Sequence, residues 1–395
     1  MNQQQQPVKI LAPRGTAQRL SRRKFLAGST VALFSSSVLL AACGTDEPGP
    51  GASGTGGGSI EDELNFFNWA AYDDQALFET FTTDVGPVAS ITEYPSNEEM
   101  IAKLATAEGT SGFDIVVPTG PFIPLMAAQD LLEPLDLDRI PNFKNIEPFY
   151  TDQPWDPGNE YTVCKDWGST GWILDTEKVS TPIATWQDFI DVAMGEASGD
   201  VSLLDAPNEL QGLYFWANGI DWNTTDPAHY DAYEAFMVNE LAPHVKAYDS
   251  YPGIALTKGN YALSQVWNGD ARQGLLDVES RGENPDRYVW GLGAPDTELW
   301  MDTWAIVKGA PNPNAAYAFI DFILDVDNSL TDLAYHGYHT GVDGVQQAAE
   351  DAGLTYLDLV FFSDEQVQTM HAQIVNEMLD RSVEIYQQAQ AASGA

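Results

Sequence analysis

The sequence predicts an α/β protein built from two lobes. Short apolar stretches bounded by turn residues alternate with helical stretches along the chain, which is the pattern of a sheet covered by helices. The part that follows residue 42 is 353 residues long, and one hydrophobic core seldom spans that length. In such proteins ligands gather at the carboxyl ends of strands, between the lobes, so we expect the site there.

The first part of the predicted fold has clear local signals. Residues 64–69 are rich in aromatic residues, Ser96 and Glu99 have the spacing of a capping box, and Gly120-Pro121 ends an apolar run. The expected elements, in order, are a strand at 64–69, a helix at 73–83, a strand at 88–94, a helix at 96–108, a strand at 113–118 and a helix from about Phe122. Their alternation predicts a parallel sheet.

The alternation resumes after residue 184. Thr185-Trp186-Gln187-Asp188 begins a helix. The further expected elements are a strand at 201–204, helices at 209–218 and 227–241, strands at 246–249, 263–267, 288–292 and 300–307, a helix at 314–324 and a last helix at 364–390.

Residues 1–42 have the form of a leader. Ser21-Arg22-Arg23-Lys24-Phe25-Leu26 is typical of a twin-arginine signal, and Leu40-Ala41-Ala42-Cys43 has the form of a lipobox. The apolar run 27–40 is shorter than the roughly 20 residues of a membrane-spanning helix. We expect export of the folded chain, a lipid on Cys43 at the outer face of the cytoplasmic membrane, and a flexible tether at 43–60. An ordinary secretory signal or a membrane anchor is the alternative.

The charge balance bears on possible partners. Residues 43–395 hold 12 Lys and Arg against 58 Asp and Glu. Nucleic acid is excluded as a partner, because phosphate contacts need basic side chains. An acid excess of this size is typical of proteins that work in concentrated salt, where remote charges are screened within roughly 3 Å at about 1 M. Only local carboxylates therefore inform us about a ligand.

The reactive residue types predict no metal and no cofactor. Cys43 and Cys164 are the two cysteines, and with Cys43 lipidated, Cys164 is expected to be a buried apolar residue. His336 and His339 have a spacing that metal ligands use, but Gly337-Tyr338 between them favours a turn. The sequence has no phosphate-binding loop, dinucleotide-binding motif or nucleophile elbow.

Four segments at the ends of predicted strands hold an aromatic or hydroxyl residue, and three of them contain Trp. They are Trp69-Ala70-Ala71-Tyr72, Val117-Pro118-Thr119-Gly120, Trp267-Asn268-Gly269-Asp270 and Trp300-Met301-Asp302. Aromatic faces attract ammonium groups by about 0.5–2 kcal/mol each, and carboxylates add charge-assisted hydrogen bonds. Ordinary core packing is the alternative for any single Trp, but the set predicts a site for an elongated organic cation.

Six segments resemble, in order, the spermidine/putrescine-binding proteins of bacterial ABC importers. They are Phe67-Asn68-Trp69 with Tyr72, Ser96-Asn97-Glu98, the run 113–118, Trp167-Gly168-Ser169-Thr170, Val266-Trp267-Asn268-Gly269 and Trp300-Met301-Asp302. The resemblance runs from about Leu64 to Tyr386. It implies a type II periplasmic-binding-protein fold, with a hinge between lobe 1 (61–172 and 303–355) and lobe 2 (173–302 and 356–395).

The resemblance also implies the ligand-binding residues: Trp69, Tyr72, Thr119, Glu209, Ser250, Trp267, Trp300, Asp302 and Tyr338, with Phe122, Asp205 and Gln373 at looser positions. Two departures stand out. The family usually has a tyrosine two residues after the Thr119 position, where this chain has Pro121 and then Phe122. The family's acidic turn has its second Asp where this chain has Ala206, one residue after Asp205.

Together, the motifs and the resemblance predict a monomeric binding protein that captures a polyamine by hinge closure and delivers it to a membrane permease. A different small amine or an amino-acid-like solute is an alternative on the same fold. A secreted hydrolase with Asp302 and Glu209 as its acid pair is an alternative of another class, since glycosidases use paired carboxyl groups. A surface adhesin or receptor scaffold is a third.

Overall fold

The computed structural model describes residues 58–70, 72–107 and 111–394. The twin-arginine motif and Cys43 lie outside these residues. Ile60–Ala395 form one compact unit. In the part of the chain that the structure describes, every helix is too short or too polar to span a bilayer.

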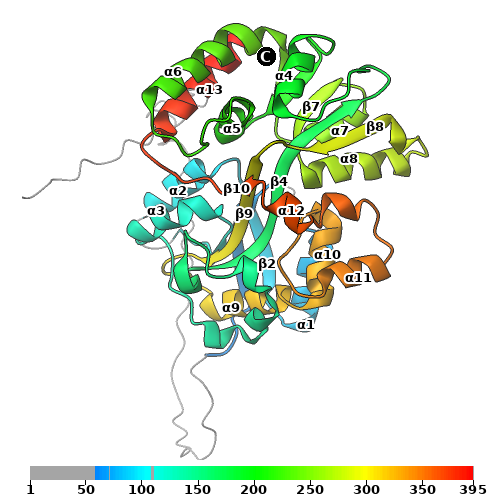
Figure 1. The fold of residues 1–395 in the computed structure, drawn as a ribbon. Helices are drawn as coiled ribbons and strands as arrows, with labels where there is room; N and C mark the ends of the chain where they lie inside the picture. Colours follow the sequence, from blue (N-terminus) through cyan, green and yellow to red (C-terminus); the bar gives the residue numbers. More distant parts are fainter. Residues whose placement is uncertain (1–57, 71, 108–110, 395) are drawn as a thin grey trace, which may run out of the picture. The chain divides into compact units, whose positions relative to one another are not determined.

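The strands form a mixed ten-stranded sheet in the order β2-β1-β3-β9-β4-β7-β5-β6, with β8 paired to β4 and β10 paired to β9 (Figure 1). Their bounds are β1 Glu63–Trp69, β2 Val88–Tyr94, β3 Ile115–Val116, β4 Thr162–Asp175, β5 Val201–Leu204, β6 Val245–Asp249, β7 Leu263–Trp267, β8 Tyr288–Leu292, β9 Thr297–Ile306 and β10 Met370–His371. The expected parallel layer is confirmed for β1, β2 and β3. The whole sheet is mixed, because β9 is antiparallel to β3 and to β4, and β4 is antiparallel to β7 and to β8.

Strand β4 joins the two halves of the sheet. Its residues from Thr162 to Ser169 pair with β9, and those from Thr170 to Leu174 pair with β7. The same strand therefore contributes to two different layers. The chain crosses between the halves at this strand and at β9, which leads from Thr297 toward β3.

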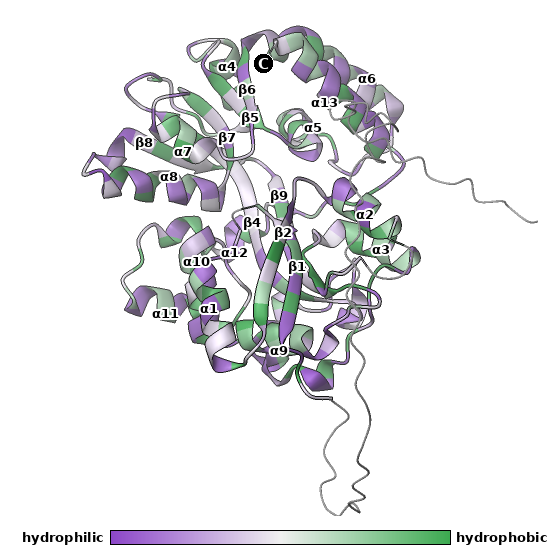
Figure 2. Ribbon diagram, turned by 180° about the vertical axis from the view of Figure 1, so that it is seen from behind, coloured by the Kyte–Doolittle hydropathy of each residue, from purple (hydrophilic) through white to green (hydrophobic). Residues whose placement is uncertain are grey.

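Helices cover both halves of the sheet. Their bounds are α1 Gln75–Asp84, α2 Asn97–Ala105, α3 Ile123–Ala128, α4 Trp186–Met194, α5 Pro207–Ala217, α6 Pro227–Phe236, α7 Pro252–Thr257, α8 Asn268–Ser280, α9 Pro313–Ile323, α10 Val326–His336, α11 Val345–Asp351, α12 Asp364–Val367 and α13 Leu379–Ser393. Figure 2 shows mixed hydropathy along outer helices such as α6 and α8, as expected where one face packs and the other meets water.

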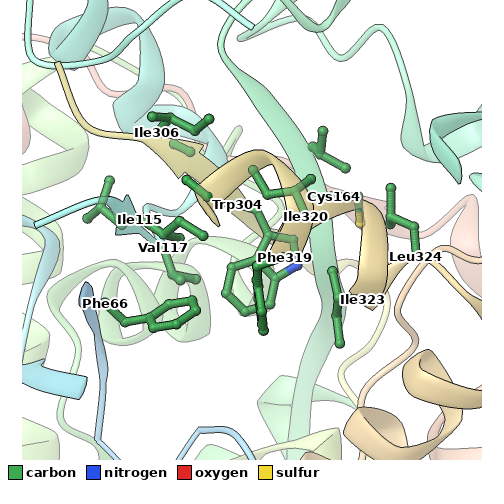
Figure 3. Close-up of a cluster of buried hydrophobic side chains, with 14 of the residues drawn as sticks. Phe66, Ile115, Val117, Cys164, Trp304, Ile306, Phe319, Ile320, Ile323 and Leu324 are labelled. Carbon is green, nitrogen blue, oxygen red and sulfur yellow. The ribbon is translucent and has the colours of Figure 1, made fainter. Parts of the chain in front are cut away.

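Each half has its own hydrophobic core. The first core surrounds Phe319 of α9, whose ring centroid lies 4.7 Å from that of Phe66 and 5.3 Å from that of Trp304 (Figure 3). The second core lies around Trp186 and Phe215. Along β4 the side chains change cores between Trp167 and Trp172, which is where this strand changes partners.

Most strands and caps lie where the sequence predicts them. Thr185 caps α4 in a capping box with Asp188, and the Ser96 side chain accepts a hydrogen bond from the Glu99 backbone N–H. Cys164 is a buried free cysteine in the first core, so this prediction is confirmed. The division into lobes at residues 172 and 302 stays a prediction.

The expected single helix at 364–390 is wrong. The chain forms the short α12, then β10, then an extended stretch before α13. Asn223 holds that stretch, because its side chain accepts a hydrogen bond from Ile374 N at 2.7 Å and donates one to the Ala372 carbonyl at 3.1 Å. These contacts bind backbone groups that a continuous helix would use internally, so tertiary contacts override the local helical pattern.

The first core provides a test of the packing. Phe319→Ala removes a fully buried ring that also contacts Phe78 and Phe81, so we expect it to lower the free energy of unfolding by about 3–5 kcal/mol. Phe149→Ala is the matched control, since half of Phe149 is exposed. Urea unfolding followed by circular dichroism measures both. Equal losses from the two variants would contradict the placement of the core at Phe319.

Candidate functional site

One face of β9 carries two acids and an indole. Glu298, Trp300 and Asp302 alternate along the strand, so they project to the same side of the sheet. On the neighbouring strand β4, Asp166 pairs with Asp302 and Gly168 pairs with Trp300. Paired residues share a face, so the crossing strands present an indole ring with a carboxyl group on either side of it along β9.

Gly168 makes room for the Trp300 ring. A Cβ atom at Gly168 would lie 2.5 Å from Cζ2 of Trp300 and 2.4 Å from Oδ1 of Asn268. The absence of a side chain at Gly168 lets the indole lie against the β4 backbone. Tyr338 meets the same ring edge to face, with 4.7 Å between the ring centroids. The buried Trp300 Nε1 has no hydrogen-bond partner among the described residues.

Asp302 lies in a shared hydrogen-bond network. The Tyr72 hydroxyl oxygen is 2.9 Å from Asp302 Oδ2 and 2.6 Å from Asp166 Oδ1. One hydroxyl proton cannot serve both carboxylates at once. Burial, reinforced by the charge of Asp166, raises the pKa of Asp302 to about 7, so this group binds a proton readily when no cation is near.

Thr119 completes the network on the side of the first core. It forms an isolated bridge with Asp302, antiparallel to strand β9. The Asn97 side chain fixes Thr119, donating to Oγ1 at 2.9 Å and accepting from the backbone N–H at 3.1 Å. The start of α2 and the loop after β3 thus hold one face of the site.

A buried ion cluster lies behind Tyr72. Lys165 Nζ is 2.8 Å from Asp73 Oδ1, 3.0 Å from Asp332 Oδ2 and 3.3 Å from Asp166 Oδ2, and it lies 4.4 Å from the Tyr72 ring centroid. His336 Nε2 is 3.2 Å from Asp332 Oδ2. Although burial opposes it, Lys165 and His336 hold the pKa of Asp332 below its usual range. The protein's own cation therefore neutralises part of the acid beneath the aromatic surface.

The sequence reading did not identify this cluster. Asp73, Lys165, Asp166 and Asp332 all contribute to it. The signal in the sequence was the charged pair Lys165-Asp166 within a strand whose residues are all buried. His336 and His339 do not act together. Gly337 ends α10 in a left-handed conformation, and His339 Nε2 lies 3.8 Å from Glu147 instead. Within the residues described, no three His, Cys, Asp or Glu side chains are grouped to hold a metal ion.

Glu209 forms a second acidic position. It lies in the first turn of α5, is fully buried, and its Oε1 accepts hydrogen bonds from Thr170 Oγ1 at 2.8 Å and Trp267 Nε1 at 2.6 Å. The buried Glu298 carboxyl group lies close enough to that of Glu209 for the two charges to act on each other. Burial raises the pKa of Glu209, and burial together with Glu209 raises the pKa of Glu298 well above its ordinary value. Sequence reasoning missed Glu298, whose signal was its alternation with Trp300 and Asp302.

Trp69 and Ser250 lie at the edges of these groups. Trp69 ends β1, donates from Nε1 to the Val117 carbonyl at 3.0 Å, and its ring centroid lies 4.7 Å from that of Tyr94. Ser250 precedes Tyr251, whose hydroxyl donates to the Ala70 carbonyl at 3.0 Å. That contact joins the loop after β6 to the loop after β1.

The three looser positions are less closely connected to the site. Phe122 is buried in the first core. Asp205 accepts hydrogen bonds from Tyr386 and Gln390, so its contacts hold α13. Gln373 is half-buried two residues after His371, which pairs with Glu298 in the sheet register. The roles of all three residues stay predictions.

Comparison with known proteins identifies the family to which this chain is similar. Residues 76–355 match the family of bacterial extracellular solute-binding proteins. The chain is 31% identical over 284 residues to the spermidine/putrescine-binding periplasmic protein of Salmonella typhimurium, covering 71% of this chain and 78% of that protein. It is 32% identical over 283 residues to a putrescine/cadaverine-binding protein of Pseudomonas aeruginosa, covering 70% and 78%.

A solved structure agrees with the sequence matches. The spermidine/putrescine ABC transporter substrate-binding protein of Streptococcus pneumoniae superposes with a TM-score of 0.70 at 25% identity, covering 84% of this chain and 100% of that one. The expected two-lobed α/β fold of periplasmic binding proteins is therefore confirmed. By its sequence match over residues 76–355 and by its fold, the chain belongs to the bacterial extracellular solute-binding protein family.

Proposed function

We propose that this protein is the lipid-anchored binding component of an ABC importer and that it captures a polyamine or a related organic cation. The observation that carries this proposal is the combination on the crossing strands. Asp302 and Trp300 share one face of β9, Tyr72 hydrogen-bonds Asp302, and Tyr338 packs on the Trp300 ring. The relatives named for spermidine, putrescine and cadaverine support the same ligand class.

A polyamine needs both kinds of contact that these residues offer. Its ammonium groups require carboxylates, which Asp302 and Glu209 provide, and its methylene chain packs against ring faces such as those of Trp267 and Trp300. Each ring contact with a cation contributes about 0.5–2 kcal/mol, and the charge-assisted hydrogen bonds add to it. A micromolar dissociation constant needs about 8 kcal/mol in total, which this set can supply.

Binding would couple to closure of the two lobes. The lobes share the crossing strands β4 and β9, and the loops after β1 and β6 meet at the Tyr251–Ala70 hydrogen bond. A ligand held by residues from both sides stabilises the state in which they are close. The closed protein would then deliver its solute to a membrane permease as a monomer tethered through Cys43. A different small amine or an amino-acid-like solute is the alternative on the same site.

The first test removes the charge of Asp302. Asp302→Asn should weaken binding of putrescine and spermidine roughly 30-fold or more, since an ammonium would lose its buried ionic partner. Isothermal titration calorimetry measures the affinity at high salt. The melting temperature of the empty variant should match or exceed the wild-type value, which separates loss of binding from loss of fold. Exposed Asp84 provides the control variant Asp84→Asn. Wild-type affinity in Asp302→Asn would refute this role.

The second test concerns the anchor. Cys43→Ser removes the thiol that the lipid would modify, so the exported protein should move from the membrane fraction to the soluble fraction. Labelling cells with a radioactive fatty acid should mark the wild-type chain and leave the variant unmarked. Cys164→Ser serves as the control, because Cys164 is buried in the first core. Retention of the Cys43→Ser variant on membranes would show that another segment anchors the protein.

A further inference from the structure

Glu298 has the position of a ligand-facing residue. It lies on β9 on the same face as Trp300 and Asp302, with the indole between the two acids along the strand. Its side chain is buried. At the start of α5, the Asn208 side-chain amide donates to the Glu298 carboxyl group. Its Nδ2 lies 3.2 Å from Oε1 and 3.5 Å from Oε2.

Glu209 and Glu298 form a carboxyl pair that is incompletely satisfied. Glu209 receives hydrogen bonds from Thr170 Oγ1 and from Trp267 Nε1, and both go to its Oε1 atom. Oε2 of Glu209 is buried and receives no hydrogen bond from an amide, hydroxyl or ring N–H of the described residues. A buried acceptor of this kind needs a proton donor, which the partner carboxyl group supplies only while it is itself protonated.

Among the described residues, no Lys or Arg forms an ion pair with either member of this pair. The groups that contact it from α5, β4 and β7 are the neutral side chains of Asn208, Thr170 and Trp267, and the charged group that acts on it along β9 is the acid Asp302. On the neighbouring strand β10, His371 pairs with Glu298 in the sheet register, and its Nε2 lies 2.8 Å from Asp296 Oδ1. None of the ion pairs formed by the described residues includes Glu209 or Glu298. Lys165 compensates acids at the other end of the site. Two buried carboxylates without a cation repel each other, so one of them retains a proton.

We propose that Glu209 and Glu298 together form a subsite for one ammonium group of the ligand, and that the empty protein holds a proton there which leaves on binding. This proposal rests on the proposed function. The ligand arrives already protonated, the Glu298 carboxyl group loses its proton to the solvent, and the ammonium takes the place of that proton between two carboxylates. No covalent bond forms or breaks in the ligand. Affinity should therefore rise with pH across the neutral range.

Calorimetry of the wild-type protein tests the proton directly. Titration with putrescine, and separately with spermidine, at pH 7 in phosphate and in Tris gives the number of protons released, because the two buffers differ in ionisation enthalpy. We expect a net release. Asp302 also titrates near pH 7, so the comparison with Glu298→Gln isolates the pair. This variant should release fewer protons, by up to one per ligand, and bind about 10-fold more weakly at pH 8. Glu79→Gln, on the exposed face of α1, should match the wild type.

The pH dependence of the melting temperature, measured without ligand, tests independently whether the carboxyl pair holds a proton. Because the pKa of Glu298 is raised in the folded state, its contribution to stability is fully present below the unfolded value near 4.3 and is lost as the pH rises through the folded value. Glutamine does not titrate. The empty Glu298→Gln protein should therefore melt at a higher temperature than the wild type at pH 8, with the difference shrinking toward pH 4.

The outcomes separate the two proposals. Polyamine binding with no proton release, or with equal release in wild type and Glu298→Gln, overturns the subsite and leaves the polyamine function standing. A wild-type protein that binds no polyamine overturns the proposed function, and the melting comparison still decides whether the carboxyl pair holds a proton. If Glu298→Gln fails to fold, the wild-type titrations alone decide, because an absence of proton release overturns the subsite.

Discussion

The antiparallel pairing of β4 with β9 is the contact on which the rest of the site depends. It sets Asp166 beside Asp302 and Gly168 beside Trp300, and it lets one strand leave the first core and enter the second. A shift of one residue in this register would turn Glu298, Trp300 and Asp302 to the opposite face of the sheet. The first core around Phe319 and the second around Trp186 fix the two ends of the pair. Packing far from the ligand thereby determines which side chains can meet it.

The candidate site buries more acidic side chains than it has cations to pair with them. Acids are buried on both sides of the Trp300 indole, but the ammonium of Lys165 serves only the side that holds Asp73, Asp166 and Asp332. Burial without a matching cation disfavours the ionised carboxylates, which costs stability in the empty protein. Under the proposed function, a cationic solute would remove this cost. The same unfavourable burial that weakens the fold would then become binding energy for a ligand of the right charge, a common conflict between stability and function.

Local signals predicted much of this fold, and long-range contacts account for the errors. Caps such as Thr185 and short apolar strands such as 201–204 depend on nearby residues, so the sequence identifies them. The break between α12 and α13 depends on Asn223, about 150 positions away, and no local pattern contains that contact. The Lys165 cluster was missed for the same reason. Its members come from β4, the loop before α1, and α10, and only the folded chain shows that they share one interior.

The acidic turn near residue 205 shows how far a resemblance can be carried. The family pattern places its second acid where this chain has Ala206, and the adjacent Asp205 hydrogen-bonds Tyr386 and Gln390 of α13. Within that turn, the chain therefore has one carboxylate fewer than the family pattern. In three dimensions a second carboxyl group still meets Glu209, but it comes from Glu298 on β9. An ammonium group requires a negative charge at a particular position, and any helix, strand or loop that reaches this position can provide it. An acid can therefore move between elements while the chemistry of the site is kept, and a motif confined to one turn cannot record that change.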